Sequence, residues 1–289
     1  MFKEAEKMSF QELIRKNTKS ISIIPTDAIP EGVPKDSIEV VLFDIYGTLF
    51  ISGAGDISIA KRESEQNISK LDDLLRKYKL EKTSAELLDE LFYEIEQSKE
   101  MLRRRGIDYP EVDIEKIWET VTGFKDRLMI KRFAIEYELI VNPVWPMPHV
   151  KELLCQCKER AILMGIISNA QFYTPYLFPS LLGRDLEDMG FAKELMFFSY
   201  VHGYCKPSLV LFEMAARNIE KVYIPREKVL YVGNDMLKDI YPAKKTGFQA
   251  ALFAGDARSL NIRKDDERVR GISPDLIITD LSQMLKFLC

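Results

Sequence analysis

Short apolar runs alternate with longer amphipathic segments over much of the chain. The run 38–44, Ile-Glu-Val-Val-Leu-Phe-Asp, is rich in β-branched residues and ends in an acid before a glycine-containing turn, which is typical of a buried parallel strand. Similar runs predict further strands, at 161–168, 196–201, 229–233, 250–254 and 276–279. Because strands that alternate with helix-length segments form mostly parallel sheets covered on both faces, we expect a doubly wound α/β core.

The region 57–143 has a different pattern. Its apolar residues recur at helical spacing, as in Leu71, Leu74 and Leu75, and we expect no strand within it. A proline-rich stretch at 141–148 precedes the return of alternating strands and helices. The pattern therefore predicts an all-helical module inserted after the first strand of the core.

The remaining boundaries follow from these two patterns. Residues 1–36 are expected to be an N-terminal extension, with one amphipathic helix over 9–16 and a proline-rich connector over 24–34. The core then comprises 37–56 together with 144–289.

Composition narrows the class of protein. With 289 residues, 46% of them hydrophobic, the chain is long enough to bury a large core. The formal net charge is −4 and acidic and basic residues are interspersed, so we expect neither a nucleic acid nor a membrane surface as a partner, but a small-molecule substrate.

The same composition bears on location and on chemistry. Four cysteines form no disulfide framework, the N-terminus lacks the apolar stretch of a signal peptide, and no run approaches the ~20 apolar residues of a membrane span, which favours a soluble cytoplasmic protein. Only two histidines, His149 and His202, are available. Metal cages and catalytic triads built on histidine are therefore disfavoured, and the chemistry is expected to rest on carboxylates, hydroxyls and lysines.

Chemically active residues cluster where the predicted strands end. In a parallel sheet the carboxyl ends of the strands meet at one edge, which is where ligands bind. The residues that follow successive strands there are Asp44, Ser168 with Asn169, Lys206, and the acidic group Asn234, Asp235 and Asp239. We therefore expect these side chains to converge on one pocket.

The order and spacing of these four motifs resemble the haloacid dehalogenase superfamily of hydrolases, over 37–56 and 144–289. The resemblance implies a Rossmann-like core with 57–143 as a helical cap over the substrate. It also implies that Asp44 is the nucleophile, that Ser168 hydrogen-bonds the electrophilic group, and that Lys206 holds the nucleophile and the developing negative charge.

The residue types suit covalent catalysis by a carboxylate. A carboxylate is a modest nucleophile, so it needs a substrate held in line and a nearby cation, which Lys206 provides. The backbone N–H groups of Gly47 and Thr48 are expected to cradle an anion in the turn after Asp44, with Asn169 as a further substrate-binding residue.

The resemblance also implies Mg²⁺ as a cofactor if the chain is a phosphatase. The expected ligands share oxygen donors that Mg²⁺ prefers, and they are Asp44, the backbone carbonyl of Tyr46, Asn234, Asp235 and Asp239. An acidic cluster of this kind beside the nucleophile is easiest to explain if a cation is bound.

Tyr46 departs from the phosphatase pattern. Most phosphatase members carry a second Asp there, which protonates the leaving oxygen, whereas the wording Asp-x-Tyr-Gly-Thr-Leu-Phe resembles the metal-independent 2-haloacid dehalogenases. A Tyr with an ordinary pKa of about 10 is a poor acid or base near neutral pH. The favoured prediction is a Mg²⁺-dependent phosphatase of small phosphomonoesters that works through an aspartyl intermediate. The alternatives are a 2-haloacid dehalogenase and a binding protein that has lost catalysis.

Overall fold

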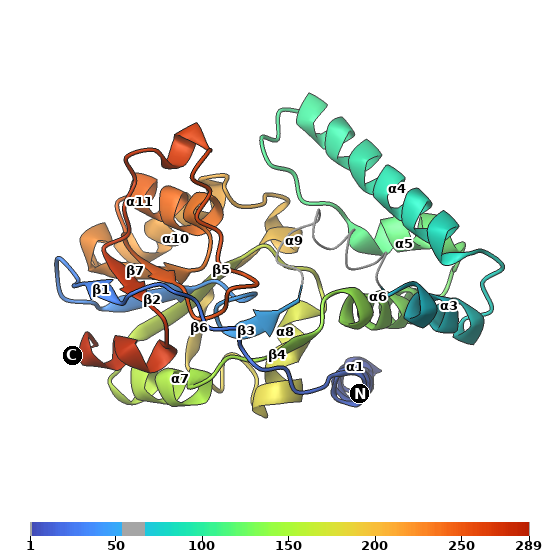
Figure 1. Cartoon of the computed structure of the whole chain (residues 1–289), viewed down its shortest axis with the longest axis horizontal. Helices are drawn as coiled ribbons and strands as arrows, with labels where there is room; N and C mark the ends of the chain where they lie inside the picture. Colours follow the sequence, from blue (N-terminus) through green and yellow to red (C-terminus); the bar gives the residue numbers. More distant parts are fainter. Residues whose placement is uncertain (1, 54–66, 289) are drawn as a thin grey trace.

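A mostly parallel sheet forms the centre of the larger lobe (Figure 1). The computed structural model describes residues 2–53 and 67–288. The strand order is β1-β9-β8-β7-β2-β5-β6, and among the described strands of this sheet only β1 pairs antiparallel with its neighbour. The strands are β1 (Glu31–Gly32), β2 (Val40–Phe43), β5 (Leu163–Ser168), β6 (Phe191–Phe198), β7 (Val229–Gly233), β8 (Gln249–Phe253) and β9 (Leu276–Ile278). The predicted doubly wound α/β core is confirmed.

Helices cover both faces of this sheet, which explains why its central strands are apolar on both sides. Every residue of β2, β7 and β8 is buried. The covering helices are α7 (Val150–Glu159), α8 (Thr174–Leu177), α9 (Ser199–His202), α10 (Val210–Glu220) and α11 (Tyr241–Thr246). Further helical turns are η1 (Phe178–Leu182), η2 (Arg226–Lys228), η3 (Met236–Ile240), η4 (Glu267–Val269) and η5 (Leu281–Lys286).

The second lobe is entirely helical within the residues described and has a hydrophobic core of its own. Its helices are α3 (Ile68–Lys77), α4 (Ser84–Arg104), α5 (Ile114–Thr122) and α6 (Arg127–Val141). Trp118 of α5 and Phe133 of α6 pack edge to face at its centre, with ring centroids 5.0 Å apart. Thr83 and Glu86 form a capping box at the start of α4, and Asp113 caps α5. The predicted helical cap is therefore confirmed, although 57–66 lies outside the described residues.

Two short strands, missed in the sequence, join the lobes. β3 (Phe50–Ser52) and β4 (Val144–Pro146) pair antiparallel where the chain leaves the core and where it returns. The Ser52 hydroxyl donates to Asn142 Oδ1 at 2.8 Å beside this pair. Each strand has only three residues, which is too short for a period-2 pattern to stand out in the sequence.

The predicted strand 196–201 is wrong in its limits. The strand β6 begins at Phe191 and ends at Phe198, and residues 199–202 form the helix α9 instead. Lys193 and Glu194 are exposed on this edge strand, so charged residues interrupt the apolar run in its first half. Edge strands tolerate such residues because one side has no neighbouring strand to pair with.

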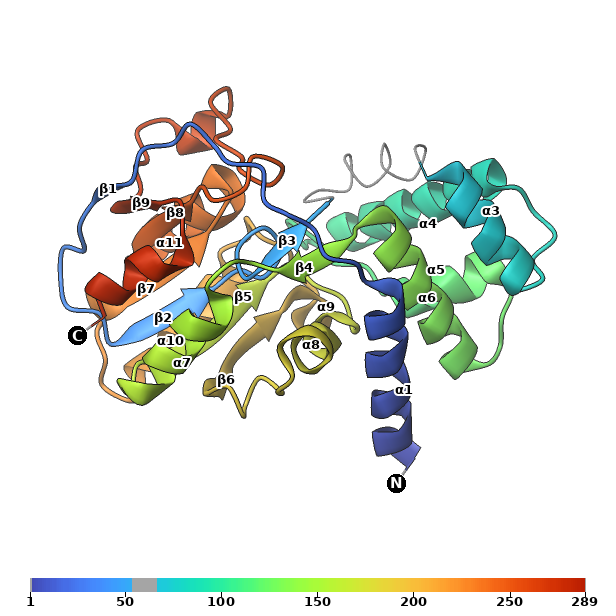
Figure 2. The same ribbon diagram turned by 60° about the horizontal axis from the view of Figure 1, so that its bottom comes forward.

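The N-terminal extension contacts both lobes. Its helix α1 (Phe2–Asn17) is longer than the predicted 9–16 and packs against α6 of the cap and α8 of the core. The Phe10 ring meets Tyr176 edge to face, with centroids 5.4 Å apart. Figure 2 shows the following segment crossing the core to reach β1 at the far edge of the sheet. The extension thus lies beside the junction between cap and core.

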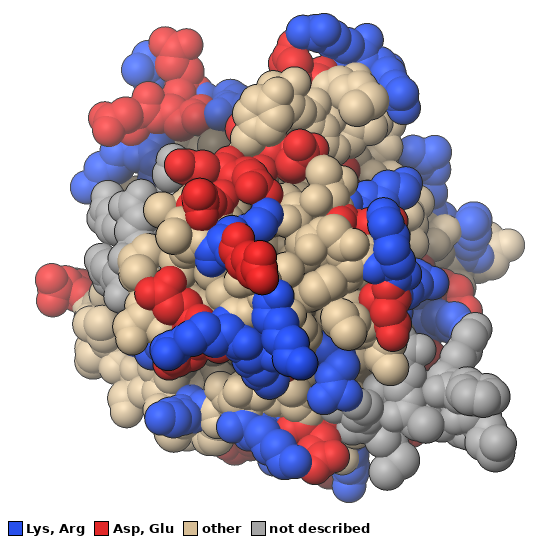
Figure 3. Space-filling view, turned by 90° about the vertical axis from the view of Figure 1, so that its right-hand side faces the viewer, with Lys and Arg blue, Asp and Glu red and all other residues tan. Residues whose placement is uncertain are grey.

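The outer face of the cap carries both signs of charge. On the face drawn in Figure 3, Lys and Arg side chains lie among Asp and Glu side chains, apart from the residues drawn in grey. In 2–53 and 67–288, no helix combines the length and apolar character needed to cross a membrane.

Candidate active site

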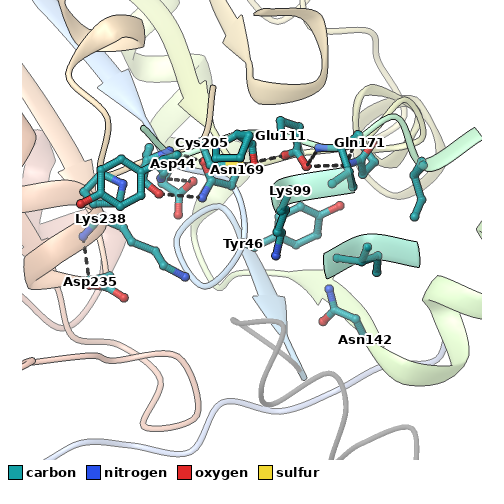
Figure 4. A pocket seen from close by; sticks show the side chains of 18 of the residues that line it. Asp44, Tyr46, Lys99, Glu111, Asn142, Asn169, Gln171, Cys205, Asp235 and Lys238 are labelled. Atoms are coloured by element: carbon teal, nitrogen blue, oxygen red, sulfur yellow. Dashed lines mark hydrogen bonds and ion pairs between the residues drawn. The ribbon is translucent and has the colours of Figure 1, made fainter. Parts of the chain in front are cut away.

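The end of β2 places Asp44 at the centre of the candidate site. β2 lies between β5 and β7, and both pair with it in parallel register, so Ser168 at the end of β5 lies beside Asp44. The Ser168 hydroxyl donates to Asp44 Oδ1 at 2.8 Å, and Lys206 Nζ lies 2.7 Å from the same oxygen. Figure 4 shows Asp44 among the residues that line the pocket. The structure thus brings the side chains of Asp44, Ser168 and Lys206 together, as the sequence predicted.

Lys206 lies between two carboxylates. Its ammonium group is 2.7 Å from Asp44 Oδ1 and 2.5 Å from Asp239 Oδ1, and it donates to the Tyr231 hydroxyl at 3.1 Å. Burial by itself would lower the pKa of Lys206, but Asp239 and Asp44 together raise it above its ordinary value. The lysine therefore stays charged next to the proposed nucleophile.

Asp239 is fully engaged by the protein. Its Oδ1 accepts from Lys206 and from the Tyr231 hydroxyl at 2.9 Å, and its Oδ2 accepts from the backbone N–H groups of Asn234 and Asp235 at 3.0 and 2.9 Å. Burial raises the pKa of Asp239 to about 6, against the opposing effect of Lys206. The four contacts fix this carboxylate behind Lys206.

Gly47 and Asn234 hold the turn that follows Asp44. Gly47 has φ +81°, and a Cβ there would lie 2.5 Å from Ser259 Cβ and 2.8 Å from Asn234 Nδ2. The Asn234 side chain accepts from Thr48 Oγ1 at 3.1 Å and donates to the Ser259 carbonyl at 2.6 Å. Gly47 marks this turn in the sequence, but nothing in the sequence indicates that Ser259 packs against it.

The backbone N–H groups of Gly47 and Thr48, which were predicted to bind a substrate anion, are hydrogen-bonded within the turn itself. The Gly47 N–H donates to the Phe50 carbonyl at 2.7 Å, and the Thr48 N–H points to the Ile45 carbonyl at 3.2 Å. Both groups are used to close the turn on itself. They are therefore not available to a substrate anion in this conformation.

Asp235 is bound to an arginine that the sequence analysis missed. Arg263 reaches Asp235 Oδ2 with Nη2 at 2.7 Å and with Nε at 3.1 Å. The other oxygen of Asp235 accepts from the backbone N–H groups of Leu237 and Lys238 at the start of η3. No motif marks Arg263 in the sequence, because it lies 28 residues further along in a loop.

These contacts test whether the residues present fit Mg²⁺. The oxygens of Asp235 and Asp239 and the amide oxygen of Asn234 all accept hydrogen bonds from protein groups, and Oδ1 of Asp44 does so as well. Within the described part of the chain, no group of three His, Cys, Asp or Glu side chains is arranged to hold a metal ion. As arranged, protein groups hold the side-chain oxygens of Asn234, Asp235 and Asp239, and Mg²⁺ as a cofactor stays a prediction.

Asn169 borders the pocket, as predicted, but its amide holds the backbone of Lys206. Asn169 Oδ1 accepts from the Lys206 N–H at 2.7 Å, and Asn169 Nδ2 donates to the Lys206 carbonyl at 3.2 Å. This pair of bonds fixes the peptide that carries the catalytic lysine candidate. Asn169 thus positions Lys206, and a role in substrate binding stays a prediction.

Tyr46 lies in the pocket with its hydroxyl 2.9 Å from Thr174 Oγ1. Burial, and after it the carboxylate of Glu138, raise the pKa of Tyr46 well above its ordinary value. A phenol of this kind neither gives up nor accepts a proton near neutral pH. Tyr46 is therefore suited to hydrogen bonding and not to acid–base catalysis.

The pocket spans the two lobes and has a volume of about 590 Å³. Its core wall carries Asp44, Asn169 and Lys206, and its cap wall carries apolar and charged residues for which the sequence predicted no role in the site. They include Leu91, Ile95, Lys99, Glu111, Trp118 and Glu138. Helical spacing placed several of these residues on one face, but it did not show that this face borders a pocket.

Glu111 ties the cap to the core beside Lys206. Its carboxylate contacts the Ser199 hydroxyl at 2.5 Å, Gln171 Nε2 at 2.9 Å and the Cys205 thiol at 3.2 Å. The Glu111 N–H donates to the Gly203 carbonyl at 3.0 Å, and the Cys205 N–H donates to the Tyr109 carbonyl at 2.7 Å. Burial raises the pKa of Glu111. The hydrogen bonds that its carboxylate accepts come from neutral groups, and they offset this rise only in part. We call the contacts of 109–112 with Gln171, Ser199 and 203–205 the latch.

Solved structures with a similar fold include several haloacid dehalogenases, and among the others are a HAD-hydrolase and a predicted phosphatase. The 2-haloacid dehalogenase from Pseudomonas syringae pv. Tomato DC3000 is 18% identical with a TM-score of 0.53, over 87% of this chain and 98% of its own. The L-2-haloacid dehalogenase RSc1362 is 16% identical with a TM-score of 0.51, over 88% and 99%. The L-2-haloacid dehalogenase from Xanthobacter autotrophicus with chloropropionic acid covalently bound is 16% identical with a TM-score of 0.50, over 87% and 98%. No protein-family profile and no curated protein sequence matches the chain.

Proposed function

Because this chain has the haloacid dehalogenase fold, we propose that it is a hydrolase in which Asp44 forms a covalent ester with the substrate. The observation that carries the proposal is the arrangement of one Asp44 oxygen, which Ser168 and Lys206 hold at 2.8 and 2.7 Å. These contacts orient the carboxylate, and its other oxygen is left to attack.

We further propose that the leaving group departs as an anion and needs no proton. Tyr46 occupies the position from which an acid would protonate a leaving oxygen, and the burial that raises its pKa makes it unsuited to that task. The possible metal ligands are engaged by protein groups. A halide fits both conditions, so the reaction that the geometry supports best is hydrolysis of a carbon–halogen bond in a haloacid.

The proposed reaction has two steps. A carboxylate oxygen of Asp44 attacks the carbon that bears the halogen, and the halide leaves with the bonding electron pair. Water then adds to the carbonyl carbon of the Asp44 ester, the bond from that carbon to the substrate oxygen breaks, and a hydroxy acid, a proton and free Asp44 result. The Lys206 ammonium offsets negative charge on Asp44 in the second step.

The Mg²⁺-dependent phosphatase stays as the second candidate. Asn234 and Asp235 border the same pocket as Asp44, so both lie near the position of a substrate phosphate. For a cation to bind there, Thr48 would have to release Asn234, and Arg263 would have to release Asp235. The phosphatase thus requires a rearrangement of the site that the haloacid reaction does not.

A substrate panel separates the two candidates. Haloacids and phosphomonoesters are incubated with the protein in a metal chelator and in excess Mg²⁺, and halide and phosphate release are measured. We expect halide release that the chelator leaves unchanged. Phosphate release that requires Mg²⁺ would establish the second candidate, and no release in any condition would favour the non-catalytic binding protein.

A second measurement tests the intermediate itself. In a single turnover in heavy-oxygen water, an ester at Asp44 requires the label to enter the Asp44 carboxylate, while the product takes its oxygen from Asp44. Mass spectrometry of the peptide that contains Asp44 detects the label. Asp44→Asn keeps the size of the side chain and is expected to lower turnover by about 10,000-fold or more. If the product of that single turnover carries the label, water attacked the substrate directly and no ester formed at Asp44.

A further inference from the structure

Lys99 lies on the face of α4 that borders the pocket. Leu91, Ile95, Lys99 and Arg103 follow one another at intervals of four residues, which places them on one side of the helix, and all four line the pocket. The Lys99 side chain is only 14% exposed, against 77% for Arg104 on the other side of α4. Figure 4 shows Lys99 extending from its helix into the pocket near Tyr46.

This ammonium group has few partners for its burial. Among the residues described, the one carboxylate within ion-pair distance of Lys99 is Glu96, at 3.4 Å, and the Glu96 side chain is 60% exposed. A charge-assisted hydrogen bond between an ammonium and a carboxylate is usually about 2.7–2.9 Å long. Since an ammonium carries three donors, and burying a charge without partners is costly, Lys99 retains donors for a ligand.

Two carboxylates of the cap wall, those of Glu111 and Glu138, are already occupied. Glu111 accepts from Ser199, Gln171 and Cys205 in the latch, and the Lys99 charge acts on it only through space. Glu138 accepts from Asn142 Nδ2 at 2.9 Å and from the Tyr173 hydroxyl. Among the described residues, neither of these carboxylates is hydrogen-bonded to Lys99, so the lysine faces the cavity as an open cationic group.

We infer that Lys99 binds an anionic group of the substrate, a carboxylate or a phosphate, that is separate from the carbon attacked by Asp44. The inference rests on the proposed function and deepens it. Lys99 lies on the cap wall and Asp44 on the core wall of a cavity of about 590 Å³, within the range of ~300–1,000 Å³ that is typical of sites for larger ligands. Leu91, Ile95 and Trp118 supply an apolar lining between cap helices. The substrate class is therefore an acid with an apolar body and a second anionic end.

Matched substrates test this assignment. The probes are 2-bromohexanoate, which has one carboxylate, 2-bromohexanedioate, which has a second carboxylate at the far end, and the bromo acid whose chain ends in a phosphate. We expect the second anion to lower KM by about 10- to 100-fold, since hydrogen bonds to charged groups contribute about 1.5–3 kcal/mol. The stronger of the two dianionic probes identifies the anion as a carboxylate or a phosphate.

The variants assign the effect to Lys99. Lys99→Met keeps the length of the side chain without its charge and is expected to remove the preference for the dianions, with little change in kcat and in the kinetics of 2-bromohexanoate. Lys99→Arg should restore part of the preference. Arg104→Met, an exposed cation on the same helix, is the matched control and should leave all three probes unchanged. Equal effects of Lys99→Met on mono- and dianionic probes would overturn the assignment.

A binding measurement keeps this test independent of the reaction. Titration calorimetry with hexanoate and hexanedioate, which carry no halogen, measures whether the second carboxylate is recognised whatever bond the protein breaks. A preference for hexanedioate that Lys99→Met abolishes supports the inference, even if no haloacid is turned over. Equal or undetectable binding of both acids would overturn it and leave the chemistry at Asp44 untouched.

Discussion

The two walls of the pocket differ in how their polar groups are held. On the core wall, Asp44, Lys206 and Asp239 are joined to one another and to Ser168, Tyr231 and backbone N–H groups by short hydrogen bonds. On the cap wall, Lys99 has one long contact with an exposed carboxylate. The core wall is thus organised before any ligand arrives, which suits chemistry, whereas the cap wall retains free donors, which suits recognition.

Removing the positive charge of Lys206, which lies between Asp44 and Asp239 on the core wall, is expected to have the largest effect. Lys206→Met leaves Asp44 and Asp239 as two buried carboxylates without a cation between them. We expect turnover to fall by about 1,000-fold or more. The free energy of unfolding should fall by about 3–5 kcal/mol, as measured by urea unfolding.

A second variant distinguishes the two effects of Lys206. Lys206→Met combined with Asp239→Asn removes one of the two facing carboxylates, so most of the lost stability should return while turnover stays low. If the double variant is no more stable than Lys206→Met alone, the electrostatic explanation of the core wall is wrong.

The latch between the walls should give an intermediate effect. Glu111→Ala removes the acceptor that Ser199, Gln171 and Cys205 share, and we expect the free energy of unfolding to fall by about 1–3 kcal/mol. KM should rise because the cap is held less firmly over the site. Glu100→Ala, on the exposed side of α4, is the control and should change neither quantity appreciably. An unchanged KM in Glu111→Ala would separate the latch from substrate binding.

The latch should also strengthen in acid. Burial raises the folded-state pKa of Glu111 above its ordinary value of about 4.3, so the folded protein holds this proton more tightly than the unfolded chain. The resulting stability is fully present below about pH 4 and is lost as the pH rises through the raised value. Lys99, Cys205 and the neutral donors face the same carboxylate and limit the shift.

Amide hydrogen exchange measures this dependence where it arises. The N–H groups of Glu111 and Cys205 both cross the latch, and their protection, corrected for intrinsic rates, should decrease as the pH rises above about 4. The comparison with Glu111→Gln is essential because Asp239 also titrates in this range. The same decrease in Glu111→Gln would show that another group is responsible.

The smallest effect is expected at Tyr46. Tyr46→Phe removes only the hydroxyl that contacts Thr174, and we expect turnover to change by less than about 3-fold with an unaltered pH profile. A general acid would instead contribute about 100- to 10,000-fold. Steady-state rates from acid to alkaline pH distinguish the two, and a large loss would return Tyr46 to the reaction.

Much of the core could be predicted from the sequence because parallel strands impose long-range order. Each buried strand delivers the residue at its carboxyl end to the same edge of the sheet, so a local pattern was enough to bring Asp44 and Ser168 together. Lys206 reaches the same edge from the loop that follows β6 and α9, in the place that the order of the motifs predicted. The helical spacing of 57–143 similarly predicted a separate helical lobe, which the described residues from 67 onward form.

The hydrogen-bond partners could not be predicted in the same way. Arg263, Ser259 and the latch residue Glu111 lie in loops, whose positions depend on packing and not on a periodic pattern. The metal ligands were predicted from residue types alone, but whether an oxygen is free depends on every neighbour within hydrogen-bond distance. For this reason the residue types at 234–239 suggested Mg²⁺. In the folded chain their side-chain oxygens accept hydrogen bonds from protein groups instead.

The sequence by itself determined the doubly wound core, the helical insert and the edge at which the candidate nucleophile lies, since these depend on periodicity and strand order. Only the tertiary structure decided which oxygens are occupied, which cap side chains face the cavity and how the two lobes touch. The physical reason is that hydrogen-bond saturation and burial are properties of the assembled neighbourhood, to which residues far apart in the chain contribute.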